Sequence, residues 1–205
     1  MMKILTLSLS IIFFLMNSGC ESDSETVMLK METELGEITI EIYLDKAPIT
    51  ALNFLKYVDD GVFKNSKFYR VVRDDNQPDN DVTIDVIQGG LSTEEEMYPP
   101  IEHETTLKTG IRHKDGAISM ARLEPGTATS EFFICVGDQP ELDFGGHRNP
   151  DGQGFAAFGK VVEGMEVVRK IHQQPVDGQI LNPEILIVNL TRLERAGTQI
   201  RSKYY

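Results

Sequence analysis

The chain of 205 residues has little of what several classes of protein require. Its two cysteines, Cys20 and Cys135, cannot supply a disulfide framework, and a chain of this length can bury a core without one. Its 20 basic residues are outnumbered by 32 acidic ones, which gives a net charge of −12. This balance argues against nucleic-acid binding, because that function needs a basic face. We therefore expect an ordinary acidic globular domain.

Motifs for several kinds of chemistry are absent as well. The four histidines show no close spacing of the kind that binds a metal ion. The sequence has no G-x-S-x-G nucleophile motif and no glycine-rich phosphate-binding loop. We therefore expect no metal site and no cofactor.

The N-terminus departs from this soluble character. Lys3 precedes the apolar run Ile4–Met16, small residues follow, and a polar stretch begins after Cys20. A positive tip, a short apolar core and small residues at the exit predict a secretory signal peptide over residues 1–19. The run is too short to indicate a membrane-spanning helix.

The end of this segment resembles a bacterial lipobox. Ser18 and Gly19 directly precede Cys20, although Asn17 stands where that motif usually has leucine. The resemblance implies that Cys20 is lipidated, that residues 20–27 form a tether, and that the protein is anchored in the bacterial cell envelope. A plain signal peptide cut nearby, or an uncleaved anchor, is the alternative. If Cys20 carries lipid, Cys135 has no partner, and its apolar strand predicts a buried, unreactive thiol.

The remaining sequence has the strand pattern of one domain, which we place at residues 28–194, followed by a flexible tail at 195–205. The runs Val27–Thr33 and Glu37–Leu44 predict two strands that form a hairpin at Gly36. A further strand is predicted over Glu184–Leu193. Two short strands joined by a Pro/Gly/Thr-rich loop are predicted within Ala117–Cys135.

Two helices are predicted among these strands. The first begins at Pro48 and stops at Gly61, with an apolar face of Ile49, Leu52, Leu55 and Val58. The second covers Gly164–Ile171, with Met165, Val168 and Ile171 turned inward. A mostly β chain with two helices is consistent with a closed antiparallel β-barrel capped by α-helices.

Four sequence blocks, taken together, carry a family resemblance. They are FYRVV at 68–72, IQGG at 87–90, AISMARLEPGTATSEFFIC at 117–135 and FGKV at 158–161. In this order they resemble the cyclophilin family of peptidyl-prolyl isomerases, over roughly Leu29 to Leu193. The resemblance implies a cyclophilin-like barrel that isomerises X–Pro bonds in proline-containing polypeptide clients and, in an exported protein, assists their folding.

The resemblance also implies a site. Arg70 aligns with the catalytic arginine, which would polarise the X–Pro amide, and Gln88 aligns with the glutamine that steadies it. By the same alignment, the residues that hold the proline ring or line the adjoining groove are Phe133, Leu142, Met120 and Ala121.

Several positions depart from the family pattern. Arg122 stands in place of an asparagine, Glu131 in place of a glutamine and Phe155 in place of a pocket histidine. Asp85 falls where an aromatic wall residue is expected, so that Val86 would take part of that role. Arg122 and Glu131 could form an ion pair across the groove, although two separately solvated charges are the alternative.

Two segments near the expected site are longer than usual in the family. The link between Arg70 and Gln88 is one, and the turn-rich segment Phe144–Gly154 is the other. His147 or Arg148 in the second segment could supplement substrate binding, or the segment could be a surface elaboration. Glu141 also replaces a large residue.

Two functions fit these observations. The first is a monomeric peptidyl-prolyl isomerase, which Arg70, Gln88 and Phe133 favour. The second is a cyclophilin-fold module that binds proline-containing segments with little catalysis, which Asp85, Arg122 and Phe155 favour.

Overall fold

The computed structural model describes residues 25–91 and 97–193. The predicted signal peptide at 1–19, the lipidation site Cys20 and the predicted tail at 195–205 lie outside these residues. The first strand begins at Thr26, within the segment predicted as tether. No helix in the described residues is long and apolar enough to span a membrane.

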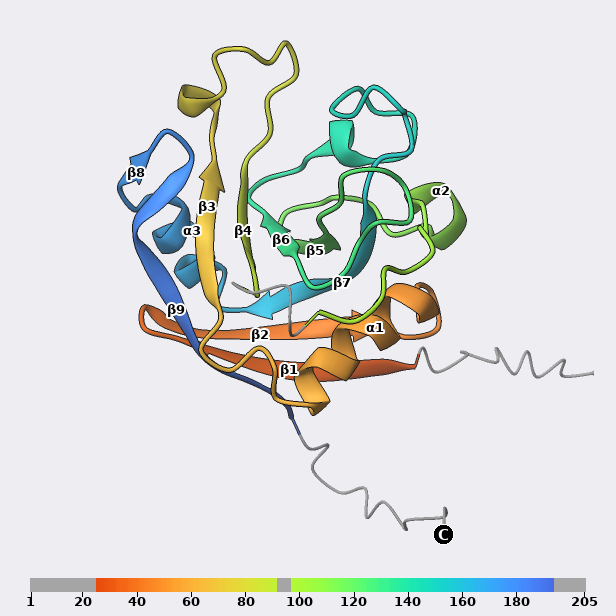
Figure 1. The fold of residues 1–205 in the computed structure, drawn as a ribbon, viewed down its shortest axis with the longest axis vertical. Helices are drawn as coiled ribbons and strands as arrows, with labels where there is room; N and C mark the ends of the chain where they lie inside the picture. The colour runs from red at the N-terminus through yellow and green to blue at the C-terminus, as the bar shows by residue number, and fades with distance from the viewer. Residues whose placement is uncertain (1–24, 92–96, 194–205) are drawn as a thin grey trace, which may run out of the picture.

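The strands of the described chain form one antiparallel sheet that closes on itself (Figure 1). Its order is β1-β2-β7-β5-β6-β4-β3-β9, and pairing of β1 with β9 completes an eight-stranded barrel, to which β8 is added through β9. This confirms the predicted closed antiparallel β-barrel. The strands are β1 (Thr26–Thr33), β2 (Gly36–Tyr43), β3 (Lys67–Val72), β4 (Val86–Gly90), β5 (Ala117–Met120), β6 (Phe132–Cys135), β7 (Ala156–Glu163), β8 (Val176–Asp177) and β9 (Ile180–Arg192).

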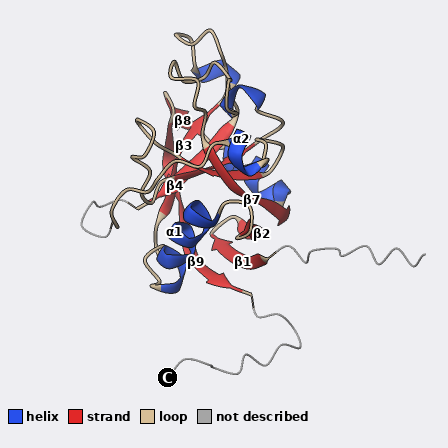
Figure 2. Ribbon diagram, turned by 90° about the vertical axis from the view of Figure 1, so that its right-hand side faces the viewer, coloured by secondary structure: helices blue, strands red, loops and turns tan. Residues whose placement is uncertain are grey.

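Both predicted helices are present, as α1 (Pro48–Asp59) and α3 (Met165–His172). A one-turn helix, α2 (Thr106–Thr109), and the 3-10 turns η1 (Asp74–Asn76) and η3 (Pro140–Leu142) were not predicted. Helix α1 packs against β2, β7 and β9, whereas α3 packs against β2 and β4. In Figure 2, α1 lies towards the lower end of the molecule and loops dominate the upper end.

The predicted inward face of α1 is partly wrong. Leu52 is 58% exposed, and the buried face instead includes Ala51, Phe54, Leu55 and Val58. This i, i+3, i+4, i+7 stripe overlaps the predicted one only in its last two members. The ring of Phe54 decides the outcome, because it packs 5.4 Å from the ring of Phe132 in β6.

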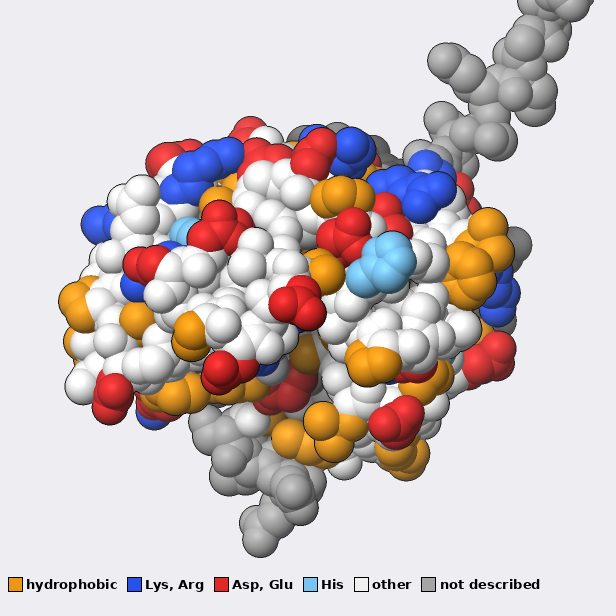
Figure 3. All heavy atoms as spheres, turned by 90° about the horizontal axis from the view of Figure 1, so that it is seen from above, with side chains coloured by type: hydrophobic (Ala, Val, Ile, Leu, Met, Phe, Trp, Pro, Cys, Tyr) orange, Lys and Arg blue, Asp and Glu red, His pale blue; other side chains and the backbone are white. Residues whose placement is uncertain are grey.

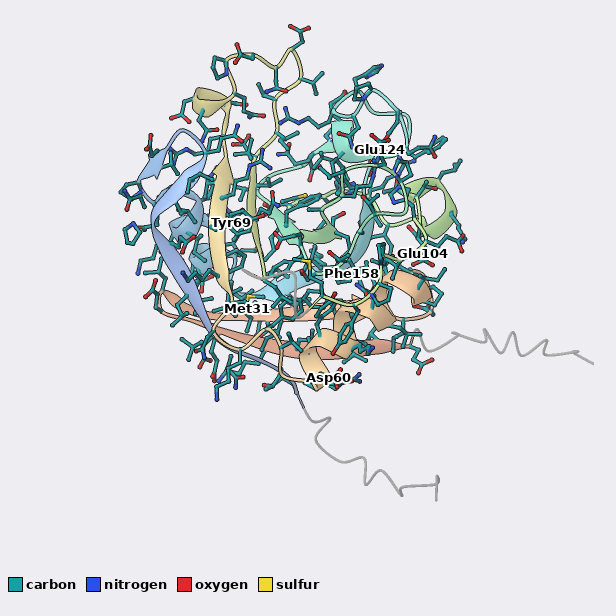
Figure 4. The ribbon with its side chains drawn as sticks, viewed as in Figure 1. Met31, Asp60, Tyr69, Glu104, Glu124 and Phe158 are labelled. Carbon is teal, nitrogen blue, oxygen red and sulfur yellow. The ribbon has the colours of Figure 1, made fainter. Side chains whose placement is uncertain are left out.

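The barrel interior is filled by alternating strand residues and by aromatic rings. Ile38, Ile40 and Ile42 of β2 are fully buried, as the alternation of this strand predicts. Figure 4 shows Met31 and Phe158 near the middle of the molecule, and both side chains are fully buried. A smaller apolar cluster lies apart from this core and includes Val86, Phe133 and Leu142.

The two long segments identified in the sequence lie together at one end of the barrel (Figure 1, top). The first, residues 73–85, is braced by Gln77, whose side-chain Nε2 donates to the carbonyl of Ile84 at 2.8 Å. The second, residues 144–154, contacts the first through Arg148, whose Nη1 donates to the carbonyl of Val82 at 2.6 Å. The two segments therefore form one wall above the barrel end.

Candidate active site

A cavity of about 440 Å³ opens beside this wall. Strands β3, β4 and β6 supply one side of it, and the loops after β5 and after η3 supply the other. Its lining includes Arg70, Val72, Ile84, Val86, Gln88, Ala121, Arg122, Leu123, Thr127, Thr129, Glu131, Phe133, Leu142, Arg148, Asn149 and Phe155. Nine of the ten residues predicted for catalysis or substrate binding are in this set.

The tenth predicted residue, Met120, is not. Met120 is 1% exposed and belongs to the main barrel core, so the structure does not place it in the lining of this cavity. The reason is strand alternation, because Met120 on β5 faces the interior whereas the following Ala121 lines the cavity.

The floor of the cavity is apolar. It is formed by the smaller cluster, in which Phe133, Leu142 and Val86 are buried and Phe155 packs at the edge. The ring of Phe133 lies 5.3 Å from that of Phe155, edge to face, and 5.9 Å from the imidazole of His113, stacked on it. Phe133 is thus held between two rings, which fixes the orientation of the surface it offers to a ligand.

Arg70 projects into the cavity from β3 and is held by two amide side chains. Its Nη1 donates to Oε1 of Gln88 at 2.9 Å, while its Nε and Nη2 donate to Oε1 of Gln179 at 3.0 and 2.6 Å. A guanidinium has five N–H donors, so these bonds leave two for a ligand. Neither partner is a carboxylate, so within the described chain no ion pair neutralises the positive charge of Arg70. Burial lowers the pKa of Arg70.

A hydrogen-bonded chain continues from Gln88 to an acidic residue. Gln88 Nε2 donates to the hydroxyl of Tyr69 at 2.6 Å, and that hydroxyl donates to Glu131 Oε2 at 2.5 Å. Burial raises the pKa of Glu131, and both burial and the carboxylate of Glu131 raise the pKa of Tyr69. Gly90 leaves room for this carboxylate, because a Cβ there would lie 2.3 Å from Glu131 Oε1.

An irregularity in β3 brings Tyr69, labelled in Figure 4, and Arg70 to the same site. Phe68 pairs with Gly89 and Arg70 with Gln88, so Tyr69 is an extra residue in this strand. Neighbouring residues of a regular strand point to opposite faces, whereas a bulge re-aims them. Both side chains consequently bond to Gln88.

The ion pair expected between Arg122 and Glu131 is not formed. Arg122 instead binds Asp151 through two hydrogen bonds of 2.7 and 3.0 Å, and its Nε donates to the carbonyl of Gly154 at 2.9 Å. Glu131 bonds to Tyr69. Arg122 therefore anchors the 144–154 segment to the rim of the cavity, and the expectation failed because Asp151 lies in a loop that the alignment could not place.

Asp85 is likewise absent from the cavity lining, which contains no aspartate among the residues that the structure describes. Its carboxylate lies 3.4 Å from Nε2 of His172 at the end of α3. The adjacent Ile84 and Val86 line the cavity instead. Of the two candidates on the second long segment, Arg148 lines the cavity, whereas His147 is exposed and bonds to Glu141 at 3.0 Å.

A buried Asp–His–Ser series lies behind the floor. Asp143 Oδ1 is 2.8 Å from Nδ1 of His113, whose Nε2 is 2.9 Å from the Oγ of Ser119. The arrangement resembles a hydrolytic triad, but Ser119 has no exposed surface and cannot reach a substrate. Its evident role is to hold the imidazole of His113 against Phe133.

Gln179 and Tyr69 were missed by the sequence analysis. Gln179 lies 109 positions from Arg70 in the sequence, in the turn between β8 and β9, and nothing in its local pattern marks it. Tyr69 lies within the FYRVV block, but regular strand alternation would have directed it away from Arg70.

Comparisons with known proteins identify the family. The family described as "Cyclophilin type peptidyl-prolyl cis-trans isomerase/CLD" matches residues 28–192. A peptidyl-prolyl cis-trans isomerase of Acinetobacter baylyi is 37% identical over 152 residues, which cover 72% of this chain and 73% of that protein. Peptidyl-prolyl cis-trans isomerase B of Escherichia coli is 36% identical over 149 residues, covering 70% of this chain and 83% of that protein.

The fold has a counterpart among solved structures. A cyclophilin-type isomerase of Cryptosporidium parvum superposes with a TM-score of 0.68 at 21% identity, covering 83% of this chain and 99% of that one. The closed barrel, the arginine-bearing apolar cavity and the family match over residues 28–192 lead to one conclusion. The chain belongs to the family of cyclophilin-type peptidyl-prolyl cis-trans isomerases.

Proposed function

We propose that this isomerase acts on proline-containing chains as they fold outside the cytoplasm, held at the cell envelope by lipid on Cys20. The observation that supports catalysis best is Arg70, fixed by two neutral amides beside an apolar floor and left with two free donors. The observation that favours an exported, anchored form is the N-terminal pattern that ends at Cys20.

The chemistry needs only binding and polarisation. Rotation about an X–Pro bond has a barrier of roughly 18–20 kcal/mol, because the amide is resonance-stabilised. A proline ring on the surface formed by Phe133, Leu142 and Val86 is gripped without a polar partner. In the twisted state the prolyl nitrogen regains its lone pair, so the Arg70 guanidinium interacts with that state more strongly than with the planar amide. An acceleration of about five decades requires about 7 kcal/mol of such preference.

The direct test is the exchange rate of a short X–Pro peptide with the Arg70→Ala variant. We expect most of the acceleration to be lost while the circular dichroism spectrum and the unfolding midpoint stay close to those of the parent. Arg169→Ala is the matched control, because Arg169 is an exposed arginine of α3 that pairs with Asp115 away from the cavity. Full activity of Arg70→Ala would refute the assigned role, and peptide binding without acceleration by the parent would select the binding-module alternative.

The anchor is tested separately. Residues 20–26 can span about 20 Å when fully extended, so a lipid on Cys20 would keep the barrel close to the membrane surface. The start of β1 lies low in Figure 1, whereas the segments beside the cavity lie at the top, an orientation that leaves the cavity open to clients. Cys20→Ser should move the protein from the membrane fraction to the soluble fraction and abolish metabolic labelling with a fatty acid. Unchanged membrane association would contradict the proposal.

A further inference from the structure

A second arginine, Arg148, shares the cavity with Arg70. It comes from the long 144–154 segment and is half-buried there. One of its donors bonds to the carbonyl of Val82 at 2.6 Å, which fixes the guanidinium against the wall beside Ile84. In the described part of the chain Arg148 makes no ion pair, so its charge and most of its donors are available to a ligand.

The charges that line the cavity do not cancel. Arg122 is paired with Asp151, and among the described residues the only carboxylate in the lining, that of Glu131, bonds to Tyr69 rather than to Arg70 or Arg148. Arg70 and Arg148 remain, and both line the same cavity. Burial, and to a smaller extent the charge of Arg70, lowers the pKa of Arg148. Two guanidiniums without a carboxylate partner among the described residues, lining one cavity, attract an anionic ligand.

The rest of the molecule makes this local positive charge unusual. The chain has a net charge of −12, and acidic side chains are spread over the face seen in Figure 3. The long-range field therefore disfavours an anion, and a preference for one can come only from contact within the cavity. A guanidinium binds a carboxylate with two parallel hydrogen bonds, which adds direction to the attraction.

We propose that Arg148 is a specificity-determining residue that binds a carboxylate next to the substrate proline, so that the enzyme prefers proline followed by an acidic residue or by the chain end. The inference rests on the proposed function, because it places the proline ring on the apolar floor with Arg70 at its amide. Arg148, bonded to the carbonyl of Val82, lines the same cavity as this apolar floor. The ligand chemistry is a carboxylate, and its source is either a side chain or a C-terminus.

The test compares three peptides by nuclear magnetic resonance exchange, which needs no coupled protease. They are acetyl-Ala-Pro-Glu-amide, acetyl-Ala-Pro-Gln-amide and acetyl-Ala-Pro with a free carboxylate. We expect kcat/KM for at least one carboxylate peptide to exceed that of the glutamine peptide by about tenfold, the effect of one charge-assisted hydrogen bond. The peptide that gains identifies the source of the carboxylate. Equal values for all three overturn the inference.

Variants assign the preference to its residue. In Arg148→Gln the ratio between the carboxylate and glutamine peptides should fall to about one or below, and in Arg148→Lys it should be largely retained. Lys170→Gln is the control for net charge, because Lys170 is exposed on α3 and its loss changes the overall field equally. Each ratio is measured within one variant, so partial loss of folded protein cancels. An Arg148→Gln ratio equal to that of the parent refutes the role of Arg148.

The two hypotheses fail differently. Acceleration of the glutamine peptide without any carboxylate preference leaves the isomerase function standing and overturns only the role of Arg148. No acceleration of any peptide overturns the proposed catalysis. In that case the ratio of dissociation constants, titrated with the same peptides and variants, decides whether Arg148 selects a carboxylate.

Discussion

Removing the carboxamide of Gln179 should impair catalysis although this residue lies at the edge of the site. Its Oε1 accepts hydrogen bonds from Nε and Nη2 of Arg70, and its own Nε2 donates to the carbonyl of Asn76 at 3.0 Å. Because the Gln179 amide is itself held by Asn76, its oxygen fixes the orientation of the Arg70 guanidinium. Gln179→Leu keeps the side-chain volume and removes this acceptor, so that Arg70 is held by Gln88 alone.

The size of the effect follows from these contacts. A hydrogen bond to a charged group contributes about 1.5–3 kcal/mol. Here two donors of Arg70 share the single oxygen of Gln179, and water from the cavity can partly replace that oxygen when it is removed. We expect a net loss of about 1.5–3 kcal/mol in transition-state stabilisation, or about 10- to 150-fold in kcat/KM. The loss should fall on kcat rather than KM, because the apolar floor that binds the ring is untouched.

The assay is peptide isomer exchange at several substrate concentrations, with urea unfolding of the same preparations. Gln179→Glu separates the loss of the acceptor from the loss of positive charge at Arg70. The carboxylate keeps an acceptor for Arg70 but neutralises its charge, and we expect this variant to be impaired as well. Gln173→Leu, at an exposed glutamine after α3, is the control for the substitution itself. Wild-type kcat/KM in folded Gln179→Leu, or a loss that merely follows the unfolded fraction, would refute the reasoning.

Three further predictions concern stability and reactivity. Arg122→Ala should lower the free energy of unfolding by about 2 kcal/mol in urea titrations, because the buried guanidinium anchors the 144–154 segment. The control Arg112→Ala removes an exposed arginine and should lower it by less than about 1 kcal/mol; equal losses would contradict the prediction. Glu131→Gln should raise the free energy of unfolding at pH 7, because burial raises the pKa of Glu131 and the folded parent holds its carboxylate ionised at a cost. As the pH falls through that raised pKa, the folded parent takes up a proton more readily than the unfolded chain, so the gain measured by urea unfolding should shrink; a gain independent of pH would be inconsistent. In the Cys20→Ser form, Cys135 should resist thiol reagents until the protein unfolds, since it is fully buried and burial raises its pKa; rapid labelling of native protein would show the strand to be open.

Much of the barrel could be predicted from local pattern. The alternation of Ile38, Ile40 and Ile42 fixes which face of β2 is buried, because side chains of a strand alternate between its two faces. Pro48 and Gly164 mark where α1 and α3 begin. The inward face of α1 was harder, since several adjacent stripes of this helix are apolar and only the packing of Phe54 against Phe132 chooses among them.

The candidate site also has a part that the sequence predicts and a part that only the folded chain decides. By themselves, the linear blocks of the sequence determined the family and which arginine and apolar residues to expect at the site, because these residues lie in or next to strands that follow one another in the family's order. The partners of those residues were decided by tertiary structure alone. Gln179 reaches Arg70 from a distant turn, Asp151 takes Arg122 away from Glu131, and a bulge turns Tyr69 towards Gln88. Sequence periodicity predicts which face of a strand a residue occupies, whereas polar side chains pair with residues that the folded chain brings close, however distant they are in the sequence.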